Sequence, residues 1–249
     1  MPSLTLLSQM IRRKLVGDPP PRDMFKPGMF LSLSAIPFLL SDDDTHIAAP
    51  EIDAADIKIN VGDVSYVDCG DLELVRLRAP DVDNQPGFFQ IQLDDQGAIQ
   101  ECRFFREIDV VYPQTEDEWF LWVNPYYGKP IEFDQYDPSY ARAYEVSQIL
   151  PMIGHPQFQL TDGTLYARHW SPSDYSIDPF VFSETQYGPG KRVVAERQWQ
   201  SMLYSRALDL PEPAPQGEYV LVSLVEEGEN ASIRVHCGID IPPSSLLAA

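Results

Sequence analysis

The sequence predicts a mainly β fold (β-rich α+β) of antiparallel sheets or barrel-like lobes, with an N-terminal amphipathic helix and one mid-chain helix. Three observations predict this class. From residue 29 onward, apolar and polar residues alternate along many short segments. Turn-forming residues separate these segments, and helix signals occur in two stretches. Short strands joined by turns favour antiparallel sheets over βαβ crossovers.

The first expected element is a helix over residues 3–16, where leucine and isoleucine recur at helical spacing after a Ser3 N-cap. Its expected partner-binding residues are Leu4, Leu7, Ile11, Leu15, Arg12 and Arg13. Four prolines between residues 18 and 27 then form a stiff, extended linker. This helix either docks on a partner or packs back on the protein's own body, and both alternatives stay open.

Period-two alternation then predicts a series of strands. They are expected around 30–33, 57–61, 64–67, 72–77, 88–93, 98–105, 119–123, 164–170, 180–182, 219–225 and 232–236. Asp137 as an N-cap and Pro138 at the first helical position predict a helix that continues to Leu150. The expected organisation is a helix and linker (1–27), a first β lobe (28–136), and a helix with a second β lobe (137–249). The two lobes can equally form one compact domain.

Two hairpins, 87–110 and 218–241, look like copies of one unit. In both, apolar strands flank an acidic turn that contains glycine, and an Ile-Asp-Val or Ile-Asp-Ile triplet closes the unit. An internal duplication explains this likeness, and so does the patterning that any two half-buried hairpins share.

The net charge limits the expected partners, and the apolar pattern limits the expected compartment. The 249 residues carry 18 basic and 38 acidic side chains, a formal charge of −20, which repels nucleic acid and anionic lipid. Residues 1–27 have five basic side chains against two acidic ones, so the rest of the chain is at −23. We expect a cytoplasmic protein, either free or peripheral to the inner membrane, because the sequence has no membrane-span-length apolar run and no signal-peptide pattern.

No motif predicts catalysis, a cofactor or a metal. The four histidines and three cysteines form no known ligand spacing, and no nucleophile motif occurs, although folding can still gather distant ligands. The adjacent residues His236 and Cys237 should point to opposite faces of a strand, so they chelate one ion poorly. Residues 188–192 suit a turn between strands better than a phosphate loop, because Pro189 removes an amide donor.

Several segments together resemble the YjfK-like bacterial family of unknown function. They are residues 61–64 with 72–76, 88–92, 166–170, 182–187, 202–206 and 218–227. The resemblance implies a cytosolic, acidic protein encoded near a phage-shock-A-like coiled-coil protein and an ATP-grasp ligase. It therefore implies a role in envelope stress or peptide modification, and it assigns no reaction.

Two functional hypotheses follow. The first is a non-enzymatic interaction or adaptor protein whose N-terminal helix docks on a coiled-coil or membrane-associated protein. The second is an enzyme or small-ligand-binding protein with a cleft between β lobes, lined by Trp170, Glu184 and Tyr187.

Overall fold

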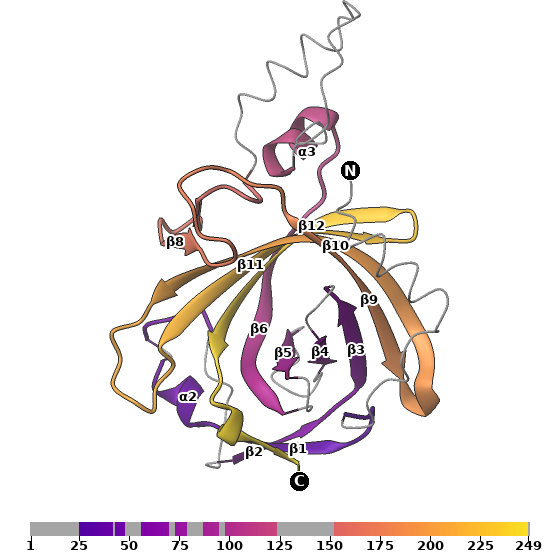
Figure 1. The fold of residues 1–249 in the computed structure, drawn as a ribbon, viewed down its shortest axis with the longest axis vertical. Helices are drawn as coiled ribbons and strands as arrows, with labels where there is room; N and C mark the ends of the chain where they lie inside the picture. The colour runs from indigo at the N-terminus through magenta and orange to yellow at the C-terminus, as the bar shows by residue number, and fades with distance from the viewer. Residues whose placement is uncertain are drawn as a thin grey trace, which may run out of the picture.

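The computed structural model of the chain describes residues 25–41, 43–47, 56–69, 73–78, 87–94, 98–123 and 152–248. These residues confirm the mainly β, antiparallel class, since they form a closed barrel with a second, smaller sheet (Figure 1). The expected helices over 3–16 and 137–150 lie outside the described residues.

The barrel has eight strands. They are β3 (Asp63–Asp68), β4 (Glu73–Arg78), β5 (Gly87–Leu93), β6 (Ile99–Val111), β9 (Phe180–Gly188), β10 (Arg192–Ala207), β11 (Gly217–Glu227) and β12 (Asn230–Asp240). Their order is β11-β12-β6-β5-β4-β3-β9-β10, and pairing of β10 with β11 closes it. The four strands of each expected lobe stay adjacent in this order, and the two groups meet where β3 pairs with β9 and where β6 pairs with β12.

Shorter elements cover the barrel. A three-stranded sheet of β1 (Phe30–Ser34), β2 (Asp56–Asn60) and β13 (Leu246–Ala248) lies at the bottom in Figure 1, near helix α2 (Ile36–Leu39). The hairpin of β7 (Gln157–Gln159) and β8 (Leu165–Arg168) joins the sheet at β10. Short 3-10 turns occupy Pro189–Lys191 and Pro243–Ser245.

The two faces of the barrel sheet differ in chemistry. Arg76 on β4 lies 4.3 Å from the ring centroid of Trp199 on β10, and because these strands are not neighbours, the contact crosses the barrel interior. The outward face carries Phe89 and Phe104, and Phe104 packs edge-on against Phe38 of α2 at 5.3 Å. The interior is therefore mixed polar and aromatic, whereas the part of the outer face covered by α2 is apolar.

The strand expected over 119–123 is wrong, since these residues lie in or immediately after helix α3 (Glu116–Trp122). Thr115 is its N-cap, and its hydroxyl accepts a hydrogen bond from the Glu118 backbone N–H at 3.3 Å. A threonine followed three residues later by glutamate is a capping-box sequence, which outweighs the strand preference of a short aromatic run.

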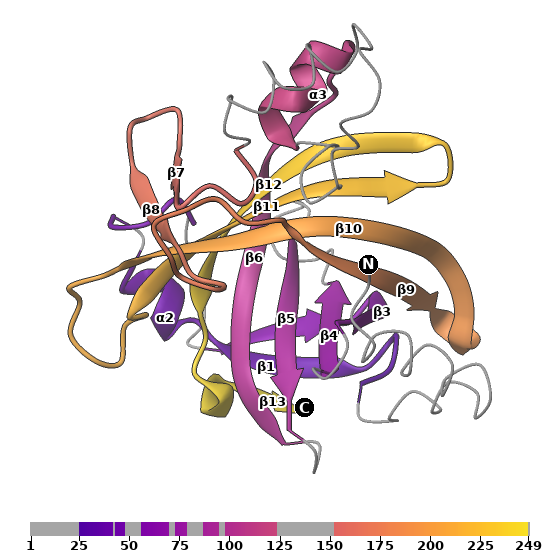
Figure 2. The same cartoon turned by 45° about the horizontal axis from the view of Figure 1, so that its top comes forward.

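The longest described strand, β10, has 16 residues and lies where the alternation predicted no strand, and Figure 2 shows it as a long curved ribbon. Residues 192–201 pair with β9, while residues 198–207 pair with β11. The turn expected before it is present, with Gly190 at φ 74°, a backbone conformation that favours glycine. This one strand thus pairs with both of its neighbours, and its pairing with β11 closes the barrel.

Candidate functional site

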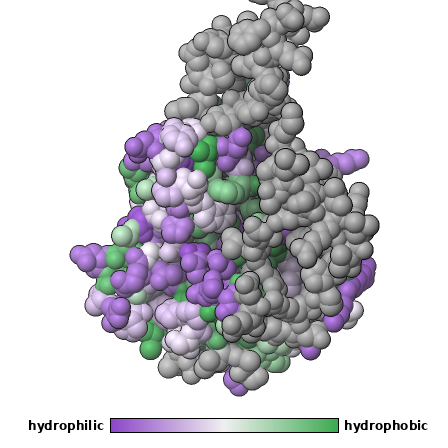
Figure 3. Space-filling model, viewed as in Figure 1, coloured by the Kyte–Doolittle hydropathy of each residue, from purple (hydrophilic) through white to green (hydrophobic). Residues whose placement is uncertain are grey.

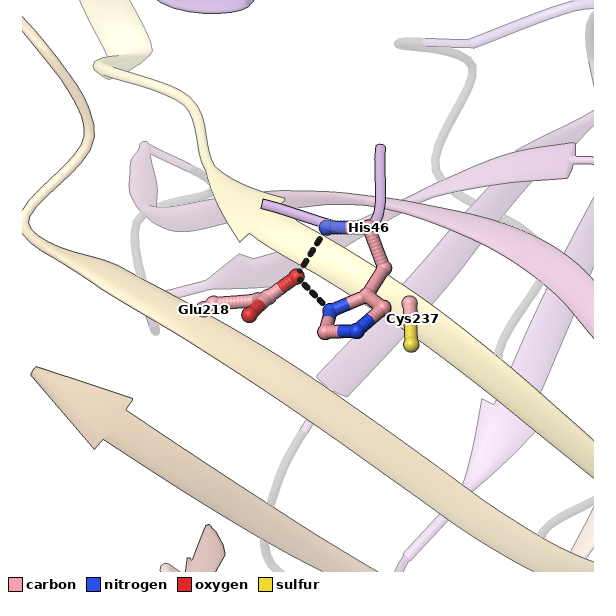
Figure 4. A group of neighbouring side chains, drawn as sticks. All are labelled: His46, Glu218 and Cys237. Atoms are coloured by element: carbon pink, nitrogen blue, oxygen red, sulfur yellow. Dashed lines mark hydrogen bonds and ion pairs between the residues drawn. The ribbon is translucent and has the colours of Figure 1, made fainter. Parts of the chain in front are cut away.

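Three chemistry-bearing side chains meet on the outer face of the barrel. Figure 4 shows His46 from the segment after α2, Glu218 at the start of β11, and Cys237 on β12. Their nitrogen, oxygen and sulfur atoms all lie within 4.8 Å of one another. Glu218 and Cys237 share a face because Cys237 pairs with Val220, two residues along β11 from Glu218. The fold therefore gathers a set of donors that the sequence does not bring together.

The Glu218 carboxylate is fully buried and is surrounded by hydrogen-bond donors. Its Oε1 accepts from the His46 backbone N–H at 2.5 Å and lies 3.0 Å from His46 Nδ1. Its Oε2 accepts from the Tyr166 hydroxyl at 2.7 Å and from Arg206 Nε at 2.7 Å. Arg206 is the direct cross-strand neighbour of Glu218, so β10 supplies the nearest fixed positive charge. Such bonds compensate the cost of removing the carboxylate from water.

His46 lies between two carboxylates. Its Nδ1 faces Glu218, and its Nε2 lies 2.7 Å from Asp162 Oδ2, in the turn between β7 and β8. Partial burial lowers the pKa of His46, but the hydrogen bonds to Asp162 and Glu218 outweigh burial and raise it above 6.5. The hydrogen bond from His46 in turn lowers the pKa of Asp162 to about 2. The cluster favours a positive charge at His46.

Cys237 is buried, and burial together with the nearby Glu218 charge raises the pKa of its thiol. A protonated, buried thiol is a poor nucleophile, because the thiolate is the reactive form. Covalent catalysis by Cys237 is therefore not what this geometry supports. Hydrogen bonding and the holding of a positive charge are the chemistry that it does support.

The expected cleft residues do not share one surface. Glu184 lies inside the barrel, where Arg76 and Arg78 donate to it at 3.3 and 3.2 Å. Although burial opposes ionisation, these guanidinium groups lower the pKa of Glu184 to about 2. Tyr187 lies on the other face of β9, edge-on to Tyr66 at 5.9 Å. Residues three apart on a strand point to opposite sides, so Glu184 and Tyr187 do not line one cleft.

Trp170 is partly buried, and its ring lies edge-on to Phe180 at a centroid distance of 5.7 Å. It packs against all three groups of buried apolar residues, one of which contains Phe182 and Trp199 of the barrel interior. Trp170 therefore has a packing role. The expected partner-binding residues Leu4, Leu7, Ile11, Leu15, Arg12 and Arg13 lie outside the described residues.

His46 was not among the expected site residues, and no local motif marks it. The His236-Cys237 pair does split across the two strand faces as expected, since His236 lies 5.2 Å from Phe88 inside the barrel. Cys237 instead meets a histidine from a distant part of the chain. Only the pairing of β11 with β12 and the path of the segment after α2 bring this group together.

Comparisons with protein-family models, curated proteins and solved structures found no match. Among the described residues, no helix combines the length and apolar character needed to cross a membrane.

Proposed function

We propose that this is a non-enzymatic interaction or adaptor protein that binds an amphipathic helix of a partner protein on α2. The observation that carries the proposal is the exposure of three large apolar side chains on this one helical turn. Ile36, Leu39 and Leu40 are 45%, 57% and 45% exposed. Residues spaced i, i+3 and i+4 lie on one side of a helix, so these three form a continuous apolar face, the α2 face.

The α2 face is held in a fixed orientation. Pro37 and Phe38 are buried on the other side of the turn, where Phe38 packs against Phe104 of the barrel. The Leu40 N–H donates to the Ile36 carbonyl at 3.0 Å, so helical geometry continues through Leu40. In helix-mediated recognition, the apolar anchors of a helix occur at this spacing.

The face of the molecule seen in Figure 3 has no large apolar patch among its described residues. In the space-filling view of Figure 3, apolar side chains on the described surface occur in small groups between hydrophilic ones. A small apolar group surrounded by polar residues suits contact with a few side chains of one helix.

Charge specifies the partner further. Residues 28–249 carry −23, so the partner helix should have basic residues beside its apolar stripe. The same charge disfavours nucleic acid as a partner. A coiled-coil or membrane-associated protein in the bacterial cytoplasm has suitable helices. The resemblance to the YjfK-like family favours such a partner in an envelope-stress or peptide-modification system.

Site-specific photocrosslinking in the native host tests the proposal. A photoreactive amino acid at Leu39 should capture one protein by an amphipathic helical segment, whereas the same amino acid at Tyr112, which is also exposed, should not. Ile36→Asp in the Leu39-labelled protein should abolish the crosslink. Equal capture at both positions would contradict the proposal. Crosslinking of Leu39 to residues 3–16 of its own chain would also contradict it, because the α2 face would then be covered from within.

A further inference from the structure

The hydrogen bonds around His46 bring two acceptor atoms, His46 Nδ1 and Glu218 Oε1, to face each other. Asp162 is an acceptor, so it fixes the hydrogen of the imidazole on Nε2, at 2.7 Å. A neutral His46 then presents the Nδ1 lone pair to Glu218 Oε1 at 3.0 Å, although Oε1 is itself an acceptor. The Tyr166 hydroxyl also lies 3.1 Å from Nδ1, but its one hydrogen is donated to Glu218 Oε2 at 2.7 Å. Two acceptors at this distance repel each other unless a positive charge lies between them. That charge is either a second proton on the imidazole or a metal ion.

The sulfur atom of Cys237 distinguishes these two occupants. A proton between Nδ1 and Oε1 needs no third donor, whereas a metal ion does, and Cys237 Sγ lies within 4.8 Å of a ring nitrogen of His46 and of a carboxylate oxygen of Glu218. Imidazole, thiolate and carboxylate together suit zinc, while magnesium and calcium prefer oxygen ligands alone. Zinc bonds of about 2.0 Å to nitrogen and oxygen place those two atoms about 3.3 Å apart in a tetrahedral site. The present separation of 3.0 Å is already close to that value.

The surrounding residues are those that support metal ligands. A histidine ligand commonly donates its other ring N–H to a carboxylate, as His46 does to Asp162. A carboxylate ligand is commonly hydrogen-bonded through its second oxygen, as Glu218 is through Tyr166 and Arg206. The atoms of His46 and Glu218 that would not bind the ion, Nε2 and Oε2, are therefore already held by hydrogen bonds.

The charge of the cluster is conserved when a divalent ion enters. With two protons on the imidazole and one on the thiol, the positive charges of His46 and Arg206 balance the negative charges of Asp162 and Glu218. A divalent ion displaces one proton from His46 Nδ1 and one from Cys237 Sγ, and both protons pass to solvent. The ion's two positive charges replace the two protons, so the total charge stays the same.

We propose that His46 Nδ1, Glu218 Oε1 and Cys237 Sγ bind one zinc ion. Three protein ligands leave the fourth position of the tetrahedron to water. By binding His46, Glu218 and Cys237 together, the ion also links the segment after α2 to β11 and β12. This site is independent of the α2 face, so either can fail without the other.

Metal titration of the purified full-length chain, after treatment with a chelator, tests the site. Zinc should bind at one ion per chain and release up to two protons, which a weakly buffered solution can measure. Cobalt(II) should bind at the same place and give the absorption of a thiolate-to-cobalt charge-transfer band. Binding without proton release and without this band would overturn the proposal, and so would no binding at all.

Variants locate the ion. Asp162→Asn alters an exposed turn and should weaken zinc binding about 10–100-fold, as loss of a supporting partner does. The matched control Asp174→Asn, in another exposed loop, should leave the affinity unchanged. Cys237→Ser should remove the charge-transfer band, whereas Cys102→Ser, at another buried cysteine, should keep it. Equal affinity in Asp162→Asn and Asp174→Asn would place the ion elsewhere, and that result does not depend on whether the cysteine variants fold.

Discussion

Among the described side chains of the barrel, one buried glutamate lies on each face of the sheet, and the two are stabilised differently. Inside, Glu184 has two arginine partners from β4, so fixed positive charges surround it. Outside, Glu218 has one arginine, one tyrosine and a histidine from the segment after α2. The inner carboxylate thus depends on permanent charges from neighbouring strands. The outer one depends partly on a charge that a proton or a metal ion can supply.

The inner arrangement is also enclosed by aromatic rings. The guanidinium carbon of Arg76 lies 4.8 Å from the centroid of Phe88, 5.4 Å from Phe182 and 4.3 Å from Trp199. Gln90 accepts two hydrogen bonds from the same guanidinium, both at 3.1 Å. Cation–π contacts and hydrogen bonds together offset the desolvation of a fully buried arginine. This face is therefore suited to a single, rigid packing.

The largest effect should come from breaking the inner pair. Arg76→Met keeps an apolar side chain among the rings but leaves Glu184 buried with Arg78 alone, so the free energy of unfolding should fall by about 3 kcal/mol. Urea unfolding measures this loss. The double variant Arg76→Met/Glu184→Gln removes the stranded charge and should recover part of the stability. If the double variant were no more stable than the single one, charge would not be the reason for the loss.

Breaking the outer group should cost less. Glu218→Gln keeps the size of the side chain but removes the charge that Arg206 and His46 face, so unfolding in the presence of chelator should become easier by about 2 kcal/mol. Glu226→Gln, at an exposed position of the same strand, is the control and should change little. A loss of stability equal to that of Arg76→Met would mean that the outer carboxylate depends on its charged partners as strongly as the inner one does.

An effect of similar size is expected in the pH dependence of the inner face. Burial, followed by the charges of Arg76, Arg234 and Arg78, lowers the pKa of His236 to about 3, although Glu107 lies 3.7 Å from Nε2. Between pH 6.5 and 3 the unfolded chain therefore binds one more proton at this residue than the folded chain, and stability falls as the pH falls. Full stability from this group is present above pH 6.5.

His236→Phe should remove this contribution while keeping an aromatic ring beside Phe88 and Trp199. From pH 7 to pH 5 the free energy of unfolding should decline by about 2 kcal/mol less in the variant than in the parent protein. Urea unfolding at both pH values provides the comparison. Because every other titrating group is common to both proteins, parallel declines would show that His236 is not held neutral.

Local patterns predicted most strands but not their partners. Alternation marked β5 and β11 because each strand alternates side chains between two different environments. The same rule failed at 119–123, where Thr115 and Glu118 cap a helix. The sequence could not predict the outer cluster of His46, Glu218 and Cys237. His46 and Glu218 are 172 residues apart and become neighbours only through the tertiary fold.

The pairing of β3 with β9 and of β6 with β12 has a consequence for the folding rate. Val64 pairs with Tyr187, and Arg106 pairs with Cys237, so each pairing closes a loop of more than a hundred residues. Closing such long loops costs entropy before the new hydrogen bonds compensate for it, so barrels of this kind fold in about milliseconds to seconds. Glu218 and Cys237 can meet early, because β11 and β12 form a hairpin. His46 is 172 residues away from Glu218 in the sequence, so the outer cluster should be completed late on the folding pathway.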